Sequence, residues 1–269
     1  MDTNRESKKR FFENIPLLHT FDDGNSWNTG GFKSLQLNYF FDLAASIPDC
    51  EVIETGSGNS TISFLLANPK KLVSISPDLE LWSRIENFCQ ETQISMKNLD
   101  SIKAKSEWEL PRLALEKNGY DIGLIDGCHG WPTAFIDLYY IHYMLRPNGY
   151  LIIDDIALHS IKEIANLLIA ESAKFVLVAD FGKTLVFKKL TNDLEFGEWV
   201  DQRYIIDKTN EARDIGNEFV LHKIDRKNPN SLNKVRRLIV DSLIFVIRAC
   251  TWILSRIRNL PANSIKHDS

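Results

Sequence analysis

Short apolar runs alternate with longer segments of helical periodicity along most of this chain. The runs are residues 52–53, 71–76, 99–104, 122–125, 150–153, 174–178 and 184–188. Between them, apolar side chains recur three and four positions apart, as in residues 60–67 and 81–89. Short apolar runs separated by amphipathic helices are typical of β-α-β units, which build a parallel sheet.

The last two runs differ, because only Asp180-Phe181-Gly182-Lys183 and its neighbours lie between them. A connection this short joins antiparallel strands, so these runs form a β-hairpin. The predicted fold class is therefore α/β: a Rossmann-like, doubly wound, seven-stranded sheet. The sheet is mostly parallel and ends in a C-terminal antiparallel hairpin strand. We expect three parts: an N-terminal arm and loop (1–34), the sheet domain (35–190) and a helical C-terminal extension (191–269).

Polar residues dominate the N-terminal arm, and a loop rich in Gly, Asn, Asp and Ser follows it. Residues 1–15 are predicted to be a frayed polar arm. The loop, residues 21–34, contains Trp27 and Phe32. Two interpretations are open: these aromatic residues form a lid over a site, or they plug the edge of the core.

A long amphipathic helix is predicted near the C-terminus, because residues 232–260 contain neither Gly nor Pro. Asp241 and Arg248 interrupt its apolar part, which is also too short for a membrane span. A broad apolar face must be buried, so we favour packing on the chain's own domain or on a second subunit of a homo-oligomer. Basic residues at both ends and Trp252 also permit peripheral membrane contact.

Composition narrows the class of protein. The chain has 269 residues, of which 44% are hydrophobic and 25% charged, as in a soluble globular protein. A net charge of −4 argues against nucleic-acid binding. The four cysteines are far apart in the sequence, so we expect buried, reduced thiols. The N-terminus lacks the apolar segment of a secretory signal, so we expect a cytoplasmic protein. It would be peripheral to a membrane if the C-terminal helix binds one.

Carboxylates follow two of the predicted parallel strands. Asp126 ends the run 122–125, and Asp154 with Asp155 ends the run 150–153. His129 lies three residues after Asp126. In an open parallel sheet, ligands bind beyond the carboxyl ends of the strands, so these four side chains are expected to gather on one rim.

A glycine-rich turn follows the first strand. Its residues are Glu54, Thr55, Gly56, Ser57, Gly58, Asn59 and Ser60. The glycines allow φ above zero and a close approach of a ligand to the backbone, and the next helix directs its free N–H groups to the same place. A nicotinamide fingerprint is disfavoured, because the third glycine is missing.

Two later strand ends offer further cofactor contacts. The second strand ends in Ser76, and Asp78 follows it as either a ribose contact or a helix N-cap. After the third strand, Ser106 is placed to contact an adenine edge. Trp108 would stack on the adenine or fill the core, and we favour the core.

Residues 35–190 resemble a class I S-adenosylmethionine-dependent methyltransferase, and most of all the methyltransferase 24 group with its catechol and caffeoyl-CoA O-methyltransferase relatives. The matching residues are Glu54–Ser60, Ile125–His129 and Ile153–Asp155. The resemblance implies S-adenosylmethionine at the turn, with Asp126 as a further contact. It also implies a divalent cation, expected to be Mg²⁺, on Asp126, Asp154 and Asp155.

Two positions depart from that pattern. Most family members carry an acidic residue where this chain has Ser76. The catechol-type enzymes place a lysine base where this chain has His129, a residue common there in the methyltransferase 24 group.

These residues suit metal-assisted O-methylation. Carboxylate oxygens are the ligands that Mg²⁺ prefers, and a metal-bound hydroxyl loses its proton more easily. Asp126 and His129 are the predicted catalytic residues: His129, with an ordinary pKa of about 6.5, would accept that proton. The expected acceptor is a hydroxyl on a small molecule, a sugar or a lipid. His142 and His159 are weaker candidates for such a role.

Three alternatives stay open. The first is an enzyme that works without a metal, and the second is a binding or scaffold protein that retains the fold without catalysis. The third is a purely structural role for the rim residues, in which Asp154 caps a helix, Asp155 is solvated and His129 forms a local hydrogen bond.

Overall fold

A computed structural model of the chain describes residues 3–19, 31–116 and 119–214. The chain divides into two compact units, Met1–Ile206 and Asp207–Ser269, and the first of them contains the sheet. Of the second, only the end of helix α8 (Arg203–Asp214) is described. The predicted helix over 232–260 and the residue Trp27 lie outside the described residues, and the three-part division of the chain stays a prediction.

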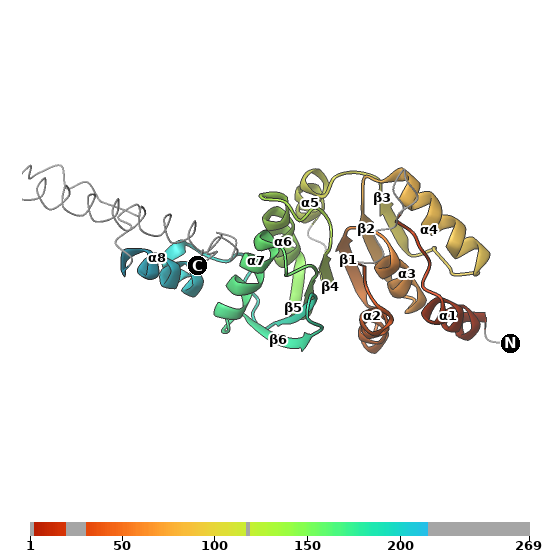
Figure 1. The fold of residues 1–269 in the computed structure, drawn as a ribbon, viewed down its shortest axis with the longest axis horizontal. Coiled ribbons are helices and arrows are strands. Elements are labelled where there is room, and N and C mark those ends of the chain that lie inside the picture. The colour runs from red at the N-terminus through yellow and green to blue at the C-terminus, as the bar shows by residue number, and fades with distance from the viewer. Residues whose placement is uncertain (1–2, 20–30, 117–118, 215–269) are drawn as a thin grey trace, which may run out of the picture. The chain divides into compact units, whose positions relative to one another are not determined.

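Seven strands form one sheet in the order β3-β2-β1-β4-β5-β7-β6 (Figure 1). The strands are β1 (Glu51–Thr55), β2 (Lys71–Ile75), β3 (Leu99–Ile102), β4 (Tyr120–Ile125), β5 (Leu145–Ile153), β6 (Phe175–Asp180) and β7 (Leu185–Lys189). The first five pair in parallel, whereas β7 runs antiparallel to both β5 and β6. The predicted seven-stranded, mostly parallel sheet with a C-terminal hairpin is therefore confirmed.

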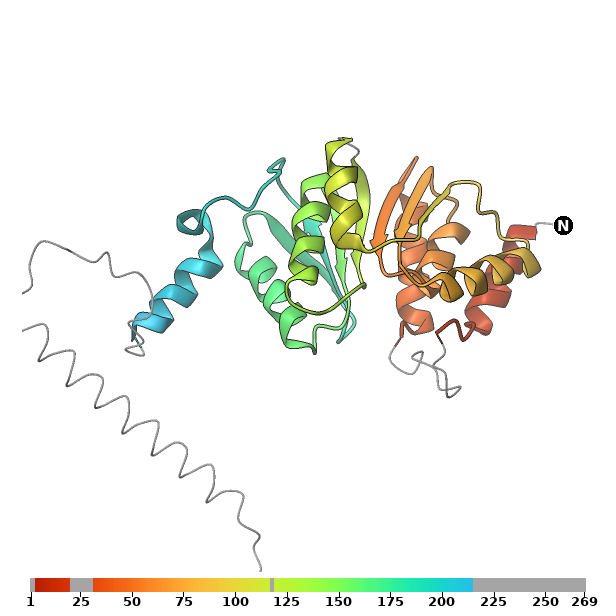
Figure 2. The same ribbon diagram turned by 90° about the horizontal axis from the view of Figure 1, so that it is seen from above.

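Helices cover both faces of the sheet, as expected for a doubly wound fold. They are α1 (Thr3–Glu13), α2 (Ser34–Ser46), α3 (Asn59–Leu66), α4 (Leu79–Glu91), α5 (Ser106–Leu115), α6 (Thr133–Met144) and α7 (His159–Ala170), with a short 3-10 helix, η2 (Trp199–Asp201). Buried residues of α5, α6 and α7 form one core, and those of α1 to α4 form another. Figure 2 shows α5–α7, in yellow-green and green, grouped apart from the red to gold helices.

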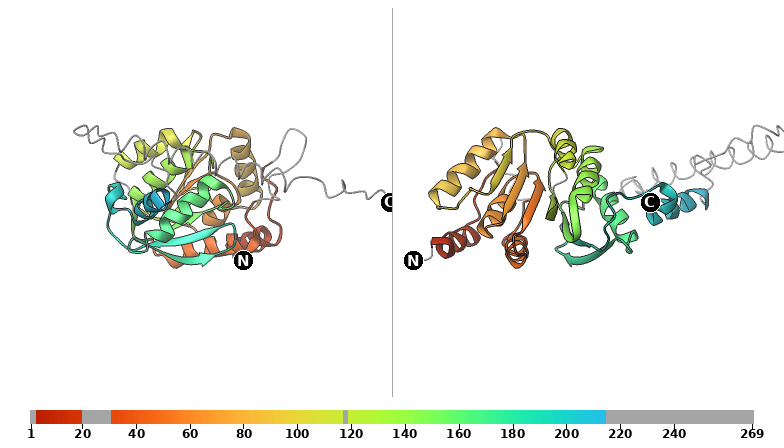
Figure 3. Two further views of the ribbon diagram at one scale, coloured as in Figure 1. Left: turned by 60° about the vertical axis from the view of Figure 1, so that its left-hand side comes forward. Right: turned by 180° about the vertical axis from the view of Figure 1, so that it is seen from behind.

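Alternate residues of the strands contribute their side chains to one core or the other. Ile53 and Leu151 face α5–α7, whereas the adjacent Val52 and Ile152 face α1–α4. Successive side chains of a strand point to opposite faces, so a strand buried on both faces must be apolar at every position. This explains why the sequence shows continuous apolar runs here. In Figure 3 the strands of the sheet lie side by side, with the teal β6 at one edge.

The N-terminal segment is more ordered than predicted. Residues 3–13 form α1 instead of a frayed arm, and Phe11 is fully buried beside Phe12 and Phe88. Phe32 packs edge-on against Phe40 in the same core, at 4.9 Å between ring centroids. Phe32 therefore fills the edge of the core and does not form a lid over a site.

Two further findings are local. Residues Arg146–Gly149 form a bulge within β5, because Leu145 still pairs with Tyr120 before Tyr150 pairs with Ile122. Cys50 and Cys89 are buried as expected, but Cys128 is exposed, so the prediction of a buried thiol is wrong there. No helix among the described residues is long and apolar enough to span a membrane.

A buried glutamate joins β1, β2 and α3. Glu54 on β1 is fully buried, and its Oε1 accepts hydrogen bonds from Thr61 of α3 and, at 2.7 Å, from Ser74 of β2. Burial raises the pKa of Glu54 to about 7, against the opposing effect of the hydroxyl donors. The folded state therefore binds a proton more tightly than the unfolded chain.

This linkage predicts a pH-dependent stability. Because the folded pKa is raised, stability from Glu54 is present below about pH 4.5 and is lost as pH rises to about 7. We expect the urea midpoint of the wild type to fall between about pH 4.5 and about pH 7.5, and Glu54→Gln to show a smaller fall. Glu91→Gln, at an exposed site on α4, is the matched control and should behave as the wild type. An unchanged fall in Glu54→Gln would contradict the prediction.

Candidate functional site

The pairing of three central strands builds a rim at their carboxyl ends. Thr55 of β1 pairs with Ile125 of β4, which in turn pairs with Ile153 of β5. The residues after these strands continue the contacts: Asp126 N–H donates to Thr55 O at 3.0 Å, and Asp154 N–H donates to Ile125 O at 3.1 Å. The glycine-rich turn and the predicted carboxylates therefore meet at one edge, as expected.

His129 lies between two carboxylates of this rim. Its Nε2 is 3.6 Å from Asp126 Oδ1, and its Nδ1 is 3.7 Å from Asp155 Oδ2. One ligand atom from each of the three residues lies within 4.8 Å of the other two. The adjacent Asp126 and then Asp155 raise the pKa of His129 against the effect of burial. Burial raises the pKa of Asp126 to about 6, and the neighbouring carboxylates add to this while His129 opposes it.

Asp154 is not a member of this group. It is nearly fully buried and accepts hydrogen bonds from Lys183 Nζ at 2.8 Å and from the hydroxyl of Thr184. Lys183 also contacts Asp155 Oδ1 at 3.1 Å. Gln36 of α2 completes the set, donating to Thr184 Oγ1 at 3.0 Å.

Lys183 is a rim residue that sequence reasoning missed. It belongs to the turn between β6 and β7, and β7 begins beside the end of β5 because Leu185 pairs with Ile153. An antiparallel strand next to a parallel one starts where its neighbour ends. The predicted hairpin therefore already contained the signal that its turn lies at the rim.

Gly56 brings the turn into contact with the rim. Its φ is +81°, and a Cβ at this position would lie 2.0 Å from the carbonyl oxygen of Asp126. Gly56 N–H donates to Ile75 O at 3.0 Å, which also ties the turn to the end of β2. A side chain at this position is excluded both by the backbone angle and by the neighbouring chain.

The other predicted cofactor residues occupy several environments. The turn from Thr55 to Ser60 lies at the end of β1 and runs into α3, with Ser57 Oγ 2.8 Å from Ser74 Oγ. Glu54 is fully buried and contacts Ser60 at the end of the turn. Ser76 is buried directly after β2, and its carbonyl accepts a hydrogen bond from Trp82 Nε1 at 3.0 Å. Asp78 Oδ1 accepts from Leu81 N–H at 2.9 Å, so of its two interpretations the helix N-cap is observed.

The region after β3 shows that the prediction for Trp108 is wrong, and it places a further acidic residue, Asp137, near Ser106. Ser106 is buried at the start of α5, but Trp108 is 74% exposed, so the core prediction for Trp108 is wrong. Beside Ser106 lies Asp137 of α6, which is fully buried. Burial raises the pKa of Asp137 to about 6, and the nearby hydroxyls of Ser106 and Thr55 moderate the effect. An acidic residue on the buried face of a helix was the overlooked signal.

The two weaker histidine candidates lie elsewhere. His142 is fully buried in α6 and packs against Phe196 and Phe175 at 4.3 and 5.3 Å between ring centroids. Burial lowers the pKa of His142 to about 3, so it is a neutral core residue. His159 is exposed at the first position of α7.

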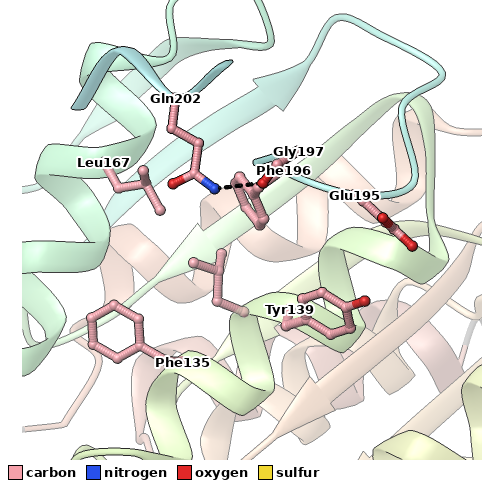
Figure 4. Close-up of a pocket in the computed structure, with 8 residues that line it drawn as sticks. Phe135, Tyr139, Leu167, Glu195, Phe196, Gly197 and Gln202 are labelled. Carbon is pink, nitrogen blue, oxygen red and sulfur yellow. Dashed lines mark hydrogen bonds between the residues drawn. The ribbon is translucent and has the colours of Figure 1, made fainter. Parts of the chain in front are cut away.

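A separate pocket lies between α6, α7 and the segment that follows β7 (Figure 4). It has a volume of about 250 Å³ and its lining is mostly apolar. The lining residues are Phe135, Leu138, Tyr139, Leu167, Glu195, Phe196, Gly197 and Gln202. The close-up shows Gln202 bonded to Gly197, and none of the rim carboxylates reaches this pocket.

Comparisons with known proteins agree with this arrangement. Residues 53–156 match the family model of a methyltransferase domain. An O-methyltransferase of Bacillus cereus, solved in complex with SAH, is 14% identical with a TM-score of 0.51, over 71% of this chain and 91% of that one. An SAH-bound methyltransferase of Podospora anserina is 12% identical with a TM-score of 0.51, over 71% and 89%. No curated protein matches.

At this level of identity the structural similarity concerns the fold. The family match spans β1, the glycine-rich turn and both carboxylate-bearing strand ends, which are the segments that carried the resemblance seen in the sequence. Residues 53–156 are thus similar to a methyltransferase domain, and they lie within a sheet that has the class I S-adenosylmethionine-dependent methyltransferase fold.

Proposed function

We propose that this protein transfers the methyl group of S-adenosylmethionine to a hydroxyl oxygen of a small molecule, sugar or lipid. The contact of Gly56 with the Asp126 carbonyl carries the proposal, because it sets the cofactor turn directly beside the group of Asp126, His129 and Asp155. Two proteins of this fold are described as bound to SAH, the product form of the same cofactor. Methyl transfer needs the acceptor oxygen held in line with the sulfonium methyl, which a rigid rim of strand ends suits.

His129 is the proposed proton acceptor. S-adenosylmethionine is already activated, so the chain must orient the hydroxyl and take up its proton. Asp126 and Asp155 flank the two ring nitrogens of His129 and stabilise the imidazolium formed when a proton arrives. The hydroxyl of Ser160 donates to the backbone oxygen of His129 and ties its loop to α7.

The same residues fit a divalent cation. His129 Nε2 is buried and makes no hydrogen bond within the part of the chain that the structure describes. Asp126, His129 and Asp155 would hold the ion, and His129 would then be a metal ligand instead of the proton acceptor. Asp154, expected as a ligand from the resemblance, would orient Lys183 and Thr184 instead. A bound ion would lower the pKa of an acceptor hydroxyl. One nitrogen ligand with two carboxylates admits Mn²⁺ as well as Mg²⁺.

A second candidate is methyl transfer without a metal, and Lys183 favours it. Its ammonium group lies within 3.1 Å of both Asp154 and Asp155 and supplies a positive charge at the rim. This charge stabilises the ionised forms of Asp154 and Asp155, so the two carboxylates do not need a metal ion to offset their repulsion.

Cofactor binding tests the proposal first. We expect the wild type to bind S-adenosylhomocysteine in a calorimeter, and Gly56→Ala to bind it about tenfold or more weakly, since the new methyl group collides with Asp126. Gly182→Ala is the matched control: it shares a positive φ of +82° but has nothing within 4 Å of its Cβ. Absence of binding by the wild type would leave only a scaffold role, and equal binding by both variants would refute the placement of the cofactor.

Metal binding separates the two candidates. If the site holds a metal, Mn²⁺ titration followed by electron paramagnetic resonance should show one site, weakened at least about tenfold in Asp126→Asn and Asp155→Asn. Asp100→Asn, on an exposed residue of β3, is the control. A wild type that binds no Mn²⁺, and that releases S-adenosylhomocysteine equally with and without chelator, would establish the metal-independent mechanism.

A further inference from the structure

The segment Pro16–His19 lies over the glycine-rich turn, although it precedes every strand of the sheet in the sequence. Asn59, the first residue of α3, donates from its side chain to Pro16 O at 3.2 Å. Arg84 of α4 donates to Leu18 O at 2.9 Å, and Leu18 itself is buried in the core. Two separate helices therefore fix this segment beside the cofactor turn.

The imidazole of His19 faces Gly58. A Cβ built on Gly58 would lie 3.0 Å from His19 Nε2, which is tighter than ordinary packing. The charged groups that act on the ring are Asp78 and Arg84, one of each sign. Burial is the largest effect and lowers the pKa of His19, so the ring is neutral and offers one hydrogen-bond donor and one acceptor. The ring makes no hydrogen bond within the described residues.

The end of β2 lacks the group that usually recognises a ribose. In nucleoside-binding α/β folds, an acidic residue about 20 positions after the glycine-rich turn binds the ribose hydroxyls. Here that position is Ser76, and it is buried. Asp78, the next acidic residue, uses Oδ1 to cap α4. A hydroxyl at this place would need another partner, and the His19 ring lies against Gly58 and close enough to Asp78 to feel its charge.

We propose that His19 binds a ribose hydroxyl of the adenosyl cofactor, in place of the acidic residue that β2 lacks. The inference rests on the proposed function, since it names a contact of the same cofactor. It assigns the N-terminal segment to the cofactor site. One residue of that site would therefore come from outside residues 53–156, the range of the family match.

Calorimetric titration with S-adenosylhomocysteine and with its 2′-deoxy and 3′-deoxy analogues tests the inference. His19→Ala should bind S-adenosylhomocysteine about five- to tenfold more weakly than the wild type, the range expected for one hydrogen bond. For one of the two deoxy analogues, His19→Ala and the wild type should bind with equal affinity, because that analogue lacks the hydroxyl that His19 binds. His19→Gln, which keeps a donor and an acceptor, should recover part of the affinity. Leu17→Ala, an exposed residue of the same segment, is the matched control and should match the wild type.

Each other outcome has a distinct meaning. Equal affinity of His19→Ala and the wild type for S-adenosylhomocysteine overturns the inference and leaves the proposed function intact. An equal loss for all three ligands also overturns it, because His19 then acts on the shape of the turn and not on a hydroxyl. No binding of S-adenosylhomocysteine by the wild type overturns the proposed function itself.

Discussion

The close approach of two backbones at the end of the central strands is the constraint on which the site depends. Gly56 turns with a positive φ against the carbonyl of Asp126, where a Cβ would lie only 2.0 Å away. The pairing of Thr55 with Ile125 fixes this approach, and the apolar cores on both faces fix the pairing. Packing of buried side chains thereby sets the spacing between the glycine-rich turn and the carboxylate rim. Chemistry that needs two reactants in line gains from that rigidity.

Charge balance is a second constraint on the rim. Three carboxylates at the ends of adjacent strands repel one another, and burial further disfavours their ionised forms. Two basic side chains offset this repulsion from different elements: His129 from the loop after β4 and Lys183 from the hairpin turn. The rim therefore contains a buried carboxylate, Asp154, which Lys183 neutralises, and a half-buried group of Asp126, His129 and Asp155. Among the residues that the structure describes, only the half-buried group has three ligand atoms close enough together to hold an ion.

Local patterns predicted much of this structure, for identifiable reasons. Strand positions and the hairpin followed from apolar runs, and the rim followed from carboxylates placed where runs end, because parallel strands share an edge. Lys183, Asp137 and His19 were missed, since packing between segments far apart in the sequence brings each of them to the strand ends. Trp108 was misplaced because the frequency with which tryptophan is buried says nothing about one helix face. The polar composition of residues 1–15 hid the contribution of Phe11 to the core.

A crystal structure of the protein with S-adenosylhomocysteine tests the placement of the cofactor most directly. We expect density for the ligand over Gly56–Gly58, with its sulfur directed toward Asp126 and His129 and its ribose toward His19. Density for the ligand at another place on the sheet, or a crystal soaked at saturating concentration that shows none, would contradict this placement.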